Sequence, residues 1–587
     1  MKQREIAAIF SQMADLLEFK GDNPFRIRAY RRAAQNLESF SGDLEPLAAG
    51  DRLTELSGIG ADLAEKIAEY LSTGTVAAFE RLKRTVPSGI LELLTVPGLG
   101  PKTAQLLHQR LRISSLSALE TAAKAHRLRG LPGFQEKKEQ NLLKALEVVK
   151  RGQVRMHLGH ALSLASELLR LLRKVSGVAH ASTAGSLRRM KETIGDIDLL
   201  VASKSSARVM KALVNSPLCA RVLVAGGTKS SILTPENVQV DLRVVPPESY
   251  GAALQYLTGS KEHNVRLREL AVRQGLKINE YGVFRVNTNA RLVGREEPQV
   301  YQALGLPWIA PELREDQGEI EAARAGRLPK LVETRHLYGD FHIHSRWSDG
   351  SDTLEELANA GAARGYQYLA ICDHSQSLKV AHGMTVQRLC QQMKAIRGLN
   401  ARSPRCRLLM GAEVDILSDG SMDYPDEVLA GLDFVIGSIH SGFSQPEAVL
   451  TQRLIKAMQN PYVTLIAHPT GRLMGQREAY PLNLGAVFQA ARATQTALEI
   501  NAYPKRLDLC DTAARRAKDL GVMLAISTDT HSLDQLDQMT IGLGVARRAW
   551  CEPDDLLNCL PYDALRAWIA RKRQRAPAPR RGAARTG

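Results

Sequence analysis

The sequence has few cysteines and no long apolar run. Its seven cysteines are scattered over 587 residues without a Cys-x-x-Cys pair. That pattern excludes a disulfide framework and is typical of reduced thiols in a cytoplasm. No apolar run reaches the roughly 18 residues of a membrane span, and the start, Met1-Lys-Gln-Arg-Glu-Ile6, lacks the apolar stretch of a signal peptide. We therefore expect a cytoplasmic protein with no membrane partner.

Acidic residues are in deficit. Asp and Glu number 62 against 78 Lys and Arg, which gives a net charge of +16 at pH 7. This balance favours a polyanionic partner such as DNA. The length predicts several domains. The end of the chain, 571–587, is rich in Arg, Ala and Pro, which predicts a disordered basic tail. This tail either touches DNA nonspecifically or only keeps the protein in solution.

Histidine is also scarce, with 14 in the chain, yet six histidines join three carboxylates in a fixed order near the C-terminus. Most of these nine residues follow short apolar runs such as Tyr368–Ile371 and Val463–Ile466, which are typical of buried strands. Barrels of alternating strands and helices carry their sites at the strands' C-terminal ends. Within the pair His342 and His344, and within the pair Asp529 and His531, the two side chains would share one face of a strand. The nine are His342, His344, Asp349, His374, Glu413, His440, His468, Asp529 and His531.

Such a set of nitrogen and oxygen ligands suffices for a cluster of zinc, manganese or iron ions. A cluster of this kind activates water and clamps a phosphate. The residues thus indicate metal-dependent phosphoester hydrolysis. The alternative is that they are ordinary core or surface histidines.

The segment from about His336 to Trp568 resembles the PHP (polymerase and histidinol phosphatase) domain, a distorted barrel of alternating strands and helices. The resemblance implies up to three Mn²⁺, Zn²⁺ or Fe ions, and a phosphate pocket lined by Asn501–Arg506 with Arg506 binding phosphate. It implies three ligand groups: His342, His344, Glu413 and Asp529; then Glu413, His440 and His468; then Asp349, His374 and His531.

Residues 1–150 are predicted to form helices joined by glycine-bearing turns, of which three resemble helix-hairpin-helix motifs. These motifs grip the DNA backbone without reading its sequence, because glycine allows a tight turn and the next helix presents free N–H groups to a phosphate. Ordinary helix connectors are the alternative. The candidate DNA-binding residues are Gly58, Gly60, Gly98, Gly100, Lys102 and Gly133.

The stretch Pro24–Ala34 with the first hairpin resembles the small N-terminal domain of the DNA polymerase X family. One branch of that family carries a 5′-deoxyribose-phosphate lyase, and the resemblance places Lys66 at the lyase nucleophile. A phosphate-binding lysine of that branch is replaced here by Asp62. A lyase also needs an amine that is partly deprotonated at neutral pH. Lys66 is therefore either a lyase residue or a lysine that contacts DNA or solvent.

Three aspartates in the middle of the chain predict a nucleotidyltransferase centre. Asp196 and Asp198 begin one apolar run, and Asp241 lies on the polar face of the alternating run Val238–Val244. Carboxylates brought together repel one another unless divalent cations bind. Two ions, Mg²⁺ or Mn²⁺, are what in-line attack on an α-phosphate requires.

These aspartates follow Gly185 and Ser186, which would cradle phosphates, and Arg189, which adds charge. The pattern resembles the polymerase β nucleotidyltransferase superfamily. The stretch Tyr256-Leu-Thr-Gly-Ser260 further resembles X-family polymerases. That resemblance implies that Tyr256 and Gly259 face the nucleotide sugar, that Asn264 contacts the base, and that Arg268 lies near the templating base. Leu257 replaces the usual phenylalanine, so the sequence leaves open whether the enzyme also incorporates ribonucleotides.

The order of these parts resembles the bacterial family X DNA polymerase with a C-terminal PHP domain. We expect a multidomain α+β and α/β protein with a helical helix-hairpin-helix region, a polymerase β-like palm and a distorted (β/α) barrel. The expected divisions are 1–85 (small DNA-binding domain), 86–150 (further hairpins), 151–248 (palm), 249–310 (nucleotide-selecting subdomain), 311–335 (linker), 336–570 (PHP barrel) and 571–587 (tail).

The resemblance implies an enzyme that uses dNTPs to fill short gaps in base excision repair, and we expect it to be a monomer. The barrel would add a 3′→5′ exonuclease or a 3′-end or abasic-site processing activity. Two other functions remain open. One is an RNA-end or template-independent nucleotidyltransferase with a PHP phosphoesterase, and the other is a DNA-binding scaffold with a structural metal barrel.

Overall fold

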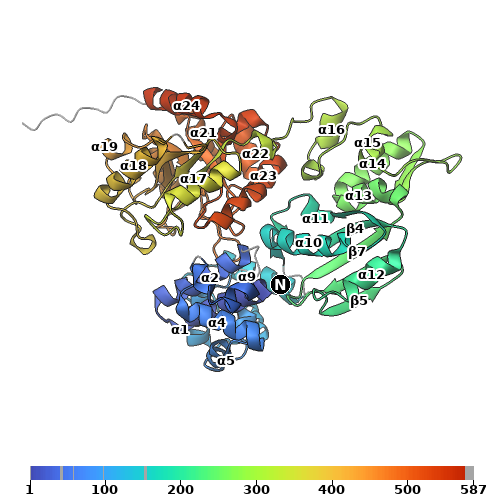
Figure 1. Cartoon of the computed structure of the whole chain (residues 1–587), viewed down its shortest axis with the longest axis horizontal. Helices are drawn as coiled ribbons and strands as arrows, with labels where there is room; N and C mark the ends of the chain where they lie inside the picture. The colour runs from blue at the N-terminus through green and yellow to red at the C-terminus, as the bar shows by residue number, and fades with distance from the viewer. Residues whose placement is uncertain are drawn as a thin grey trace, which may run out of the picture.

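A computed structural model describes residues 2–39, 44–56, 58–96, 98–150, 155–402 and 404–575. The described chain forms three bodies (Figure 1): a helical N-terminal region, a mixed region built around a five-stranded sheet, and a C-terminal barrel. All seven cysteines are free thiols. Within the described residues, no helix combines the length and apolar character that crossing a membrane requires.

The N-terminal region is built from helices around its own apolar core, which includes Phe10, Tyr30 and Leu107. The Phe10 and Tyr30 rings meet edge to face, with centroids 5.6 Å apart, and join helices α1 and α2. The elements are α1 (Lys2–Lys20), α2 (Pro24–Ser39), α3 (Leu44–Ala49), η1 (Leu53–Glu55), α4 (Ala61–Thr73), α5 (Ala77–Arg84), α6 (Ile90–Leu93), α7 (Pro101–Leu111), α8 (Leu116–Lys124) and α9 (Glu136–Lys150).

The middle region holds a five-stranded sheet of order β2-β4-β7-β6-β5, in which β4 and β7 are parallel neighbours. Helix α10 buries Leu164 and Leu168 in the core that this sheet shares. The elements are β1 (Met156–His157), α10 (Leu158–Arg173), β2 (Val178–Thr183), α11 (Gly185–Arg188), β3 (Thr193–Ile194), β4 (Ile197–Ser203), α12 (Ser206–Val214), β5 (Arg221–Ala225), β6 (Lys229–Leu233) and β7 (Gln239–Val245).

A second part of the middle region follows the sheet and has a separate core around Val283, Val300 and Tyr301. The stretch expected as a linker, 311–335, carries helical turns, and Arg314 within it is fully buried. Glu312, Arg314 and Glu315, which are among the charged residues that suggested a linker, instead make ion pairs inside the fold. The elements are η2 (Pro247–Ser249), α13 (Tyr250–Thr258), α14 (Lys261–Arg273), β8 (Leu276–Asn279), β9 (Gly282–Arg285), β10 (Arg291–Val293), α15 (Glu297–Gln302), η3 (Pro311–Leu313), α16 (Glu319–Arg324) and η4 (Thr334–His336).

Seven parallel strands form the C-terminal barrel in chain order, from β11 to β17. A parallel bridge between Ile343 and Thr530 brings the two edge strands together and nearly closes it. The expected fold class is therefore confirmed. The strands are β11 (Gly339–Ile343), β12 (Tyr368–Ile371), β13 (Arg407–Asp415), β14 (Phe434–Ser438), β15 (Val463–Ile466), β16 (Ala497–Asn501) and β17 (Leu524–Ser527).

Helices surround this barrel, and the last of them, α24, reaches into the expected tail. Residues 571–575 belong to this helix. Its buried Lys572 donates to the Thr494 carbonyl and the Thr496 hydroxyl at 3.0 and 2.8 Å. Residues 576–587 lie outside the described chain. The helices are α17 (Leu354–Ala363), η5 (Lys379–Ala381), α18 (Val386–Asn400), α19 (Asp426–Leu429), α20 (Glu447–Gln459), α21 (Leu484–Thr494), α22 (Asp511–Asp519), η6 (Leu533–Gln538), α23 (Met539–Arg548), η7 (Pro553–Asp555), η8 (Leu557–Cys559) and α24 (Tyr562–Arg575).

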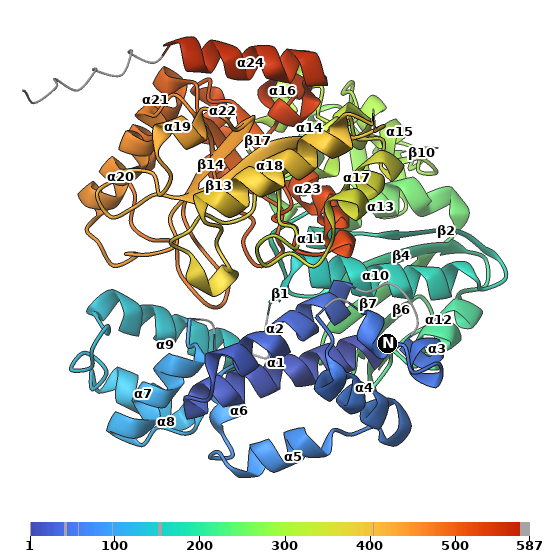
Figure 2. The ribbon, with the colours of Figure 1, turned by 60° about the vertical axis from the view of Figure 1, so that its left-hand side comes forward.

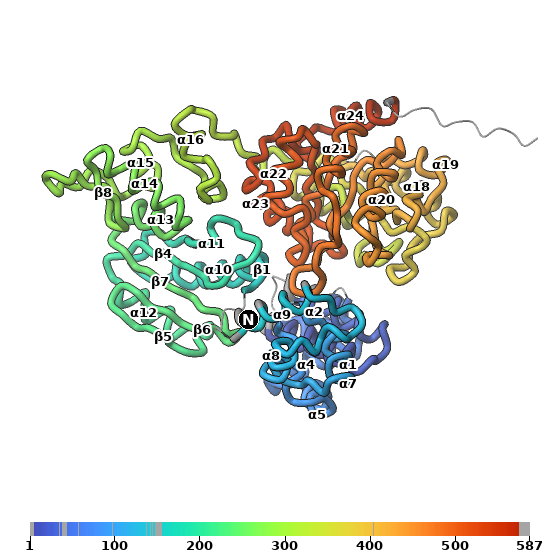
Figure 3. The backbone as a smooth tube through the Cα atoms, turned by 180° about the vertical axis from the view of Figure 1, so that it is seen from behind, coloured from blue at the N-terminus to red at the C-terminus, as the bar shows by residue number. Residues whose placement is uncertain are grey.

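The barrel lies beside each of the other two bodies (Figures 2 and 3). It shares one apolar core with the sheet region, to which Leu158 and Ile541 both belong, and polar contacts join it to both bodies. Arg472 of the barrel donates to both carboxylate oxygens of Glu192, at 3.1 and 2.8 Å, which joins the barrel to the sheet region. The Gly98 amide donates to the Gly475 carbonyl at 3.4 Å and joins the helical region to the barrel. The second hairpin therefore contacts the barrel.

Candidate functional site

The three aspartates of the middle region come together on two adjacent parallel strands. Asp198 in β4 is paired in register with Asp241 in β7, and Asp196 directly precedes β4. Parallel pairing at the same register places their side chains on one face of the sheet. The two sequence segments predicted to carry carboxylates are thus neighbours in space.

Gly185 is required by the packing of this cluster. Its φ is +59°, and a Cβ at this position would overlap the Asp198 carboxylate. The preceding Ala184 amide donates to the Asp198 carbonyl at 2.8 Å, which ties the turn to the strand. Any side chain at residue 185 would displace Asp198, so the glycine supports the position of the carboxylate.

The cluster carries more negative charge than its surroundings balance. Burial, and then the carboxylates of Asp196 and Asp241, raise the pKa of Asp198 to about 7. The nearest ammonium is that of Lys229, 3.3 Å from Asp241 and half exposed. Hard divalent cations would relieve this repulsion with oxygen ligands of the type they prefer. The residues therefore fit Mg²⁺ or Mn²⁺.

Arg189 connects this cluster to two other parts of the chain. Its guanidinium donates to the Thr258 carbonyl and lies 3.1 Å from Glu315. Glu315 also accepts from Arg548 of barrel helix α23, at 2.8 Å. The barrel therefore contacts, through one carboxylate, the arginine expected at the triphosphate.

The residues expected to select the nucleotide share one region. Tyr256 is 37% exposed at the end of α13. The Asn264 side chain donates to the Tyr256 carbonyl at 2.7 Å, and Arg268 donates to the Asn264 carbonyl at 3.3 Å. Gly259 lies beside the Arg189 guanidinium. The structure thus brings Tyr256, Gly259, Asn264 and Arg268 together.

A buried ion network behind this region was not predicted from the sequence. Glu297 accepts from Arg188 at 2.6 and 2.8 Å, from Arg314 at 2.7 Å and from the Trp308 indole at 2.9 Å. Arg188 also donates to the Thr258 hydroxyl at 2.7 Å. The network therefore fixes the chain next to Gly259.

Replacing Glu297 with glutamine is expected to destabilise the α13–α16 segment by about 3–5 kcal/mol, because it leaves the buried guanidinium of Arg314 and the partly buried one of Arg188 uncompensated. Burial opposes ionisation, but Arg188 and Arg314 lower the pKa of Glu297 to about 2. The stabilisation is therefore complete above the ordinary value of 4.5 and is lost as pH falls towards 2.

Hydrogen exchange of peptides over 297–314 tests this expectation. Exchange should be faster in Glu297→Gln at pH 7, and the difference from wild type should shrink below about pH 4.5. The exposed neighbour Glu296 supplies the matched control, Glu296→Gln. Equal exchange in the wild type and both variants would contradict a stabilising network.

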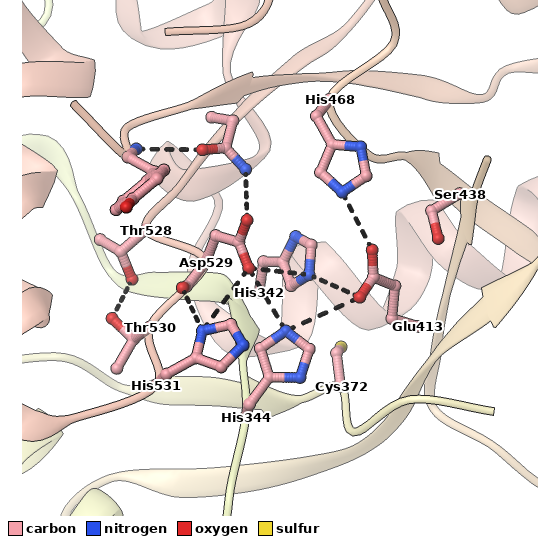
Figure 4. Close-up of polar contacts among 12 residues, drawn as sticks. His342, His344, Cys372, Glu413, Ser438, His468, Thr528, Asp529, Thr530 and His531 are labelled. Carbon is pink, nitrogen blue, oxygen red and sulfur yellow. Dashed lines mark hydrogen bonds and ion pairs between the residues drawn. The ribbon is translucent and has the colours of Figure 1, made fainter. Parts of the chain in front are cut away.

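The second candidate site lies at the C-terminal ends of the barrel strands (Figure 4). Glu413 of β13 is its centre, fully buried among imidazoles from four other strand ends. Its carboxylate oxygens lie within 2.8–3.7 Å of ring nitrogens of five histidines: His342 (3.3 Å), His344 (3.7 Å), His374 (2.8 Å), His440 (3.3 Å) and His468 (3.1 Å).

The ligand-type atoms form overlapping groups that differ in part from the expected division. His344 and His374 each belong to two of these groups, so each of these two imidazoles lies between neighbouring sets of ligand-type atoms. The groups whose atoms lie within 4.8 Å of one another are His344, Asp349, His374 and His531; His342, His344 and Asp529; and His374, Glu413 and His440.

Asp529 and His531 do not share a strand face as expected, because β17 ends at Ser527. Both lie in the following loop, where Asp529 has φ of 54°. This turn brings His531 to 3.4 Å from Asp349, and Asp529 to 3.4 Å from His344. A local left-handed residue, not strand alternation, brings the pair to the site.

The imidazoles have the chemistry of metal ligands. Both ring nitrogens of His344 and Nε2 of His342 are buried and make no hydrogen bond to any residue in the described chain. Burial, and then His531 and His374, lower the pKa of His344 to about 3. A neutral imidazole such as that of His344, whose one buried lone pair accepts no hydrogen bond from any described residue, is suited to bind a cation. The donor set therefore fits Zn²⁺, Mn²⁺ or Fe.

Two carboxylates that orient the histidines were not predicted. Glu499 of β16 lies 2.7 Å from Nδ1 of His342, and Asp415 of β13 lies 2.6 Å from Nδ1 of His440. Contacts of this kind fix the tautomer of a metal-ligating histidine. Glu499 could have been found from the sequence, since it interrupts the apolar run Ala497–Ile500.

The chain is similar over nearly its whole length to one curated protein. It is 40% identical over 573 residues to the DNA polymerase/3′-5′ exonuclease PolX of Bacillus subtilis (strain 168), covering 97% of this chain and 100% of that protein. The chain belongs to the bacterial PolX family. Both candidate sites lie within the shared length.

Family models match separate parts of this PolX family member. They are a helix-hairpin-helix domain (1–76), a SAM-like helix-hairpin-helix tandem (90–147), a DNA polymerase beta thumb (253–315) and a PHP domain (340–502). The chain is also 28% identical over 231 residues to a probable phosphatase of Thermoanaerobacter sp. (strain X514), which covers 37% of this chain and 89% of that protein. A probable phosphatase of Acetivibrio thermocellus is 29% identical over 33% of this chain and 78% of that protein.

The helix-hairpin-helix glycines lie in left-handed turns before α4, α7 and α9. Gly58, Gly98 and Gly133 have φ of 72°, 82° and 75°, while Gly60 and Gly100 directly precede α4 and α7. Lys102 lies in the first turn of α7. Lys66, in α4, donates to the Asp62 carboxylate and carbonyl. The Lys66 ammonium is thus held by the residue that replaces the expected phosphate-binding lysine.

Proposed function

We propose that this protein is a DNA polymerase that fills short gaps during base excision repair, joined to a metal-dependent 3′→5′ exonuclease or 3′-end or abasic-site processing activity. The observation that carries the proposal is the presence of two separate carboxylate and imidazole centres in a chain related end to end to a DNA polymerase/3′-5′ exonuclease.

In the polymerase site, Asp196, Asp198 and Asp241 would hold two divalent ions, Mg²⁺ or Mn²⁺. Such ions activate the 3′-oxygen and neutralise the triphosphate. The Gly185–Ser186 turn and Arg189 would bind the β- and γ-phosphates. Tyr256 and Gly259 would face the sugar, Asn264 the base, and Arg268 the template.

In the barrel, His342, His344, Asp349, His374, Glu413, His440, His468, Asp529 and His531 would hold up to three Mn²⁺, Zn²⁺ or Fe ions. Bound ions of this kind supply a hydroxide at neutral pH and polarise the phosphodiester. Arg506, which lies 3.4 Å from Asp529, would bind the phosphate beside them.

We also propose the domain division expected from the sequence, with 311–335 packed into the fold and the barrel extended to Arg575 by α24. We further propose a monomer that acts in the cytoplasm on gapped DNA and dNTPs. The separate apolar cores of the helical region and of the α13–α16 segment support these divisions. The free cysteines agree with a reducing compartment. Lyase activity is not part of the proposal, because the Lys66 ammonium is paired with Asp62.

A single assay tests both centres. Purified protein is incubated with Mn²⁺ and a 5′-labelled primer annealed across a one-nucleotide gap. The primer should grow by one nucleotide with the matching dNTP and shorten without any dNTP. Extension without shortening would reduce the barrel to a structural role or another substrate. No extension would contradict the proposed polymerase.

A further inference from the structure

A cavity of about 870 Å³ lies between the N-terminal region and the open end of the barrel. The candidate ligands Asp349, Asp529 and His531 line it on the barrel side, and helix α2 with the turn of the first hairpin lines it on the other. Helix α2 stands at the edge of the helical region that faces the barrel (Figures 1 and 3). The volume falls within the roughly 300–1,000 Å³ of ligand sites.

Helix α2 and the first hairpin form one wall of this cavity. Arg32 donates to the carbonyl of Asp349 at 2.6 Å, which fastens the helix to the loop carrying that ligand. A Cβ on Gly58 would lie 2.9 Å from Asn36 and 3.2 Å from Arg32. The turn is therefore packed directly on the helix. The helix and the turn are thus both tied to the barrel loop that carries Asp349.

The cavity wall carries positive charge on both sides. Arg28 and Arg32 line it from α2, and Arg346 and Arg506 line it from the barrel. Of the carboxylates that line it, Glu55 is paired with Arg52 at 2.8 Å, whereas Asp349 and Asp529 belong to the candidate ligand set. Guanidinium groups arranged around a space next to metal ligands are suited to phosphodiesters.

An exposed aromatic ring completes this surface. Phe25, the second residue of α2, is 70% exposed and lines the cavity. The Arg28 guanidinium lies 4.5 Å from its ring centroid. Aromatic rings beside basic groups bind single strands, because every base can stack on the ring while the backbone meets the charge. An unpaired strand end fits this combination better than a duplex or a small phosphomonoester.

We infer that helix α2 and the first hairpin are part of the barrel's substrate site, and hold the unpaired 3′ end of a DNA strand. Phe25 stacks on a base, and Arg28 and Arg32 bind the backbone phosphates leading to the barrel's ligands. The inference rests on the proposed hydrolysis of DNA 3′ ends. It assigns the N-terminal region a role in hydrolysis besides its role in gripping gapped DNA.

The test compares two substrates with the full-length protein and Mn²⁺: a single-stranded oligonucleotide, and bis(p-nitrophenyl) phosphate, which is too small to reach α2. Phe25→Ala and Arg28→Glu should each lower the ratio of the two kcat/KM values about tenfold or more, mainly by raising KM for the strand. The control is Arg26→Glu, on the same helix, whose guanidinium is 3.5 Å from Asp22 and does not line the cavity.

Ratios equal to that of wild type in both Phe25→Ala and Arg28→Glu would overturn the inference. An equal loss on both substrates would overturn it too, because the effect would then lie in the metal centre. Wild-type protein that cleaves neither substrate would contradict the proposed function itself. The three outcomes are distinguishable in one experiment.

A second readout does not depend on activity. With EDTA present, a strand carrying 2-aminopurine near its 3′ end should lose fluorescence on binding wild-type protein, because the base stacks on Phe25. The quenching should be retained by Arg26→Glu and lost in Phe25→Ala at saturating protein. Equal quenching in Phe25→Ala would place the 3′ end elsewhere and overturn the inference.

Discussion

An Asp198→Ala variant is expected to lose primer extension by about a thousandfold or more, while it still shortens a primer in the absence of dNTPs. Asp198 is the most buried of the three aspartates and pairs in register with Asp241. Without the Asp198 side chain, the turn at Gly185 no longer packs against a carboxylate of the cluster. The variant should then hold neither the ions nor the triphosphate in position.

The loss should be confined to the polymerase site. Steady-state extension across a one-nucleotide gap and 3′ shortening of the same labelled primer are measured on one protein preparation. Glu248→Gln removes an exposed carboxylate from the same region and should leave both rates unchanged. Extension that survives in pure Asp198→Ala protein would show that the aspartates are not the catalytic centre.

Much of this site could be predicted because its residues are close in sequence or lie in strands with a clear period. Asp196 and Asp198 are two apart, and the alternation over Val238–Val244 indicates which face carries Asp241. Likewise, apolar runs that end in a histidine or carboxylate indicate the rim of a parallel barrel. Local periodicity is visible in a single sequence.

Partners that are far apart in the chain could not be predicted in the same way. Glu297 pairs with Arg188 across 109 positions, and Arg548 meets Glu315 across 233. Neither contact leaves a spacing or a period in the sequence. The charged stretch 311–335 suggested a solvated linker for the same reason: the charges that Arg314 and Glu315 pair with lie elsewhere in the chain.

A Glu413→Gln variant is expected to lose shortening of the primer about a hundredfold or more and to keep extension. The buried carboxylate contacts five imidazoles, and although burial opposes ionisation, His440, His342 and His374 hold the pKa of Glu413 well below its usual range. Glutamine has almost the same shape but no charge to balance the ions between those rings. The variant should therefore bind less metal without a change in packing.

Metal content separates this account from a folding defect. Purified Glu413→Gln should retain fewer Mn²⁺ or Zn²⁺ ions per chain than wild type after dialysis, as measured by plasma emission, while its extension rate stays within about twofold. Glu427→Gln, an exposed change on the same barrel, is the matched control and should retain metal and both activities. Loss of extension together with shortening would instead indicate one shared site or a collapsed fold. Full shortening in Glu413→Gln would show that hydrolysis does not depend on the barrel's central carboxylate.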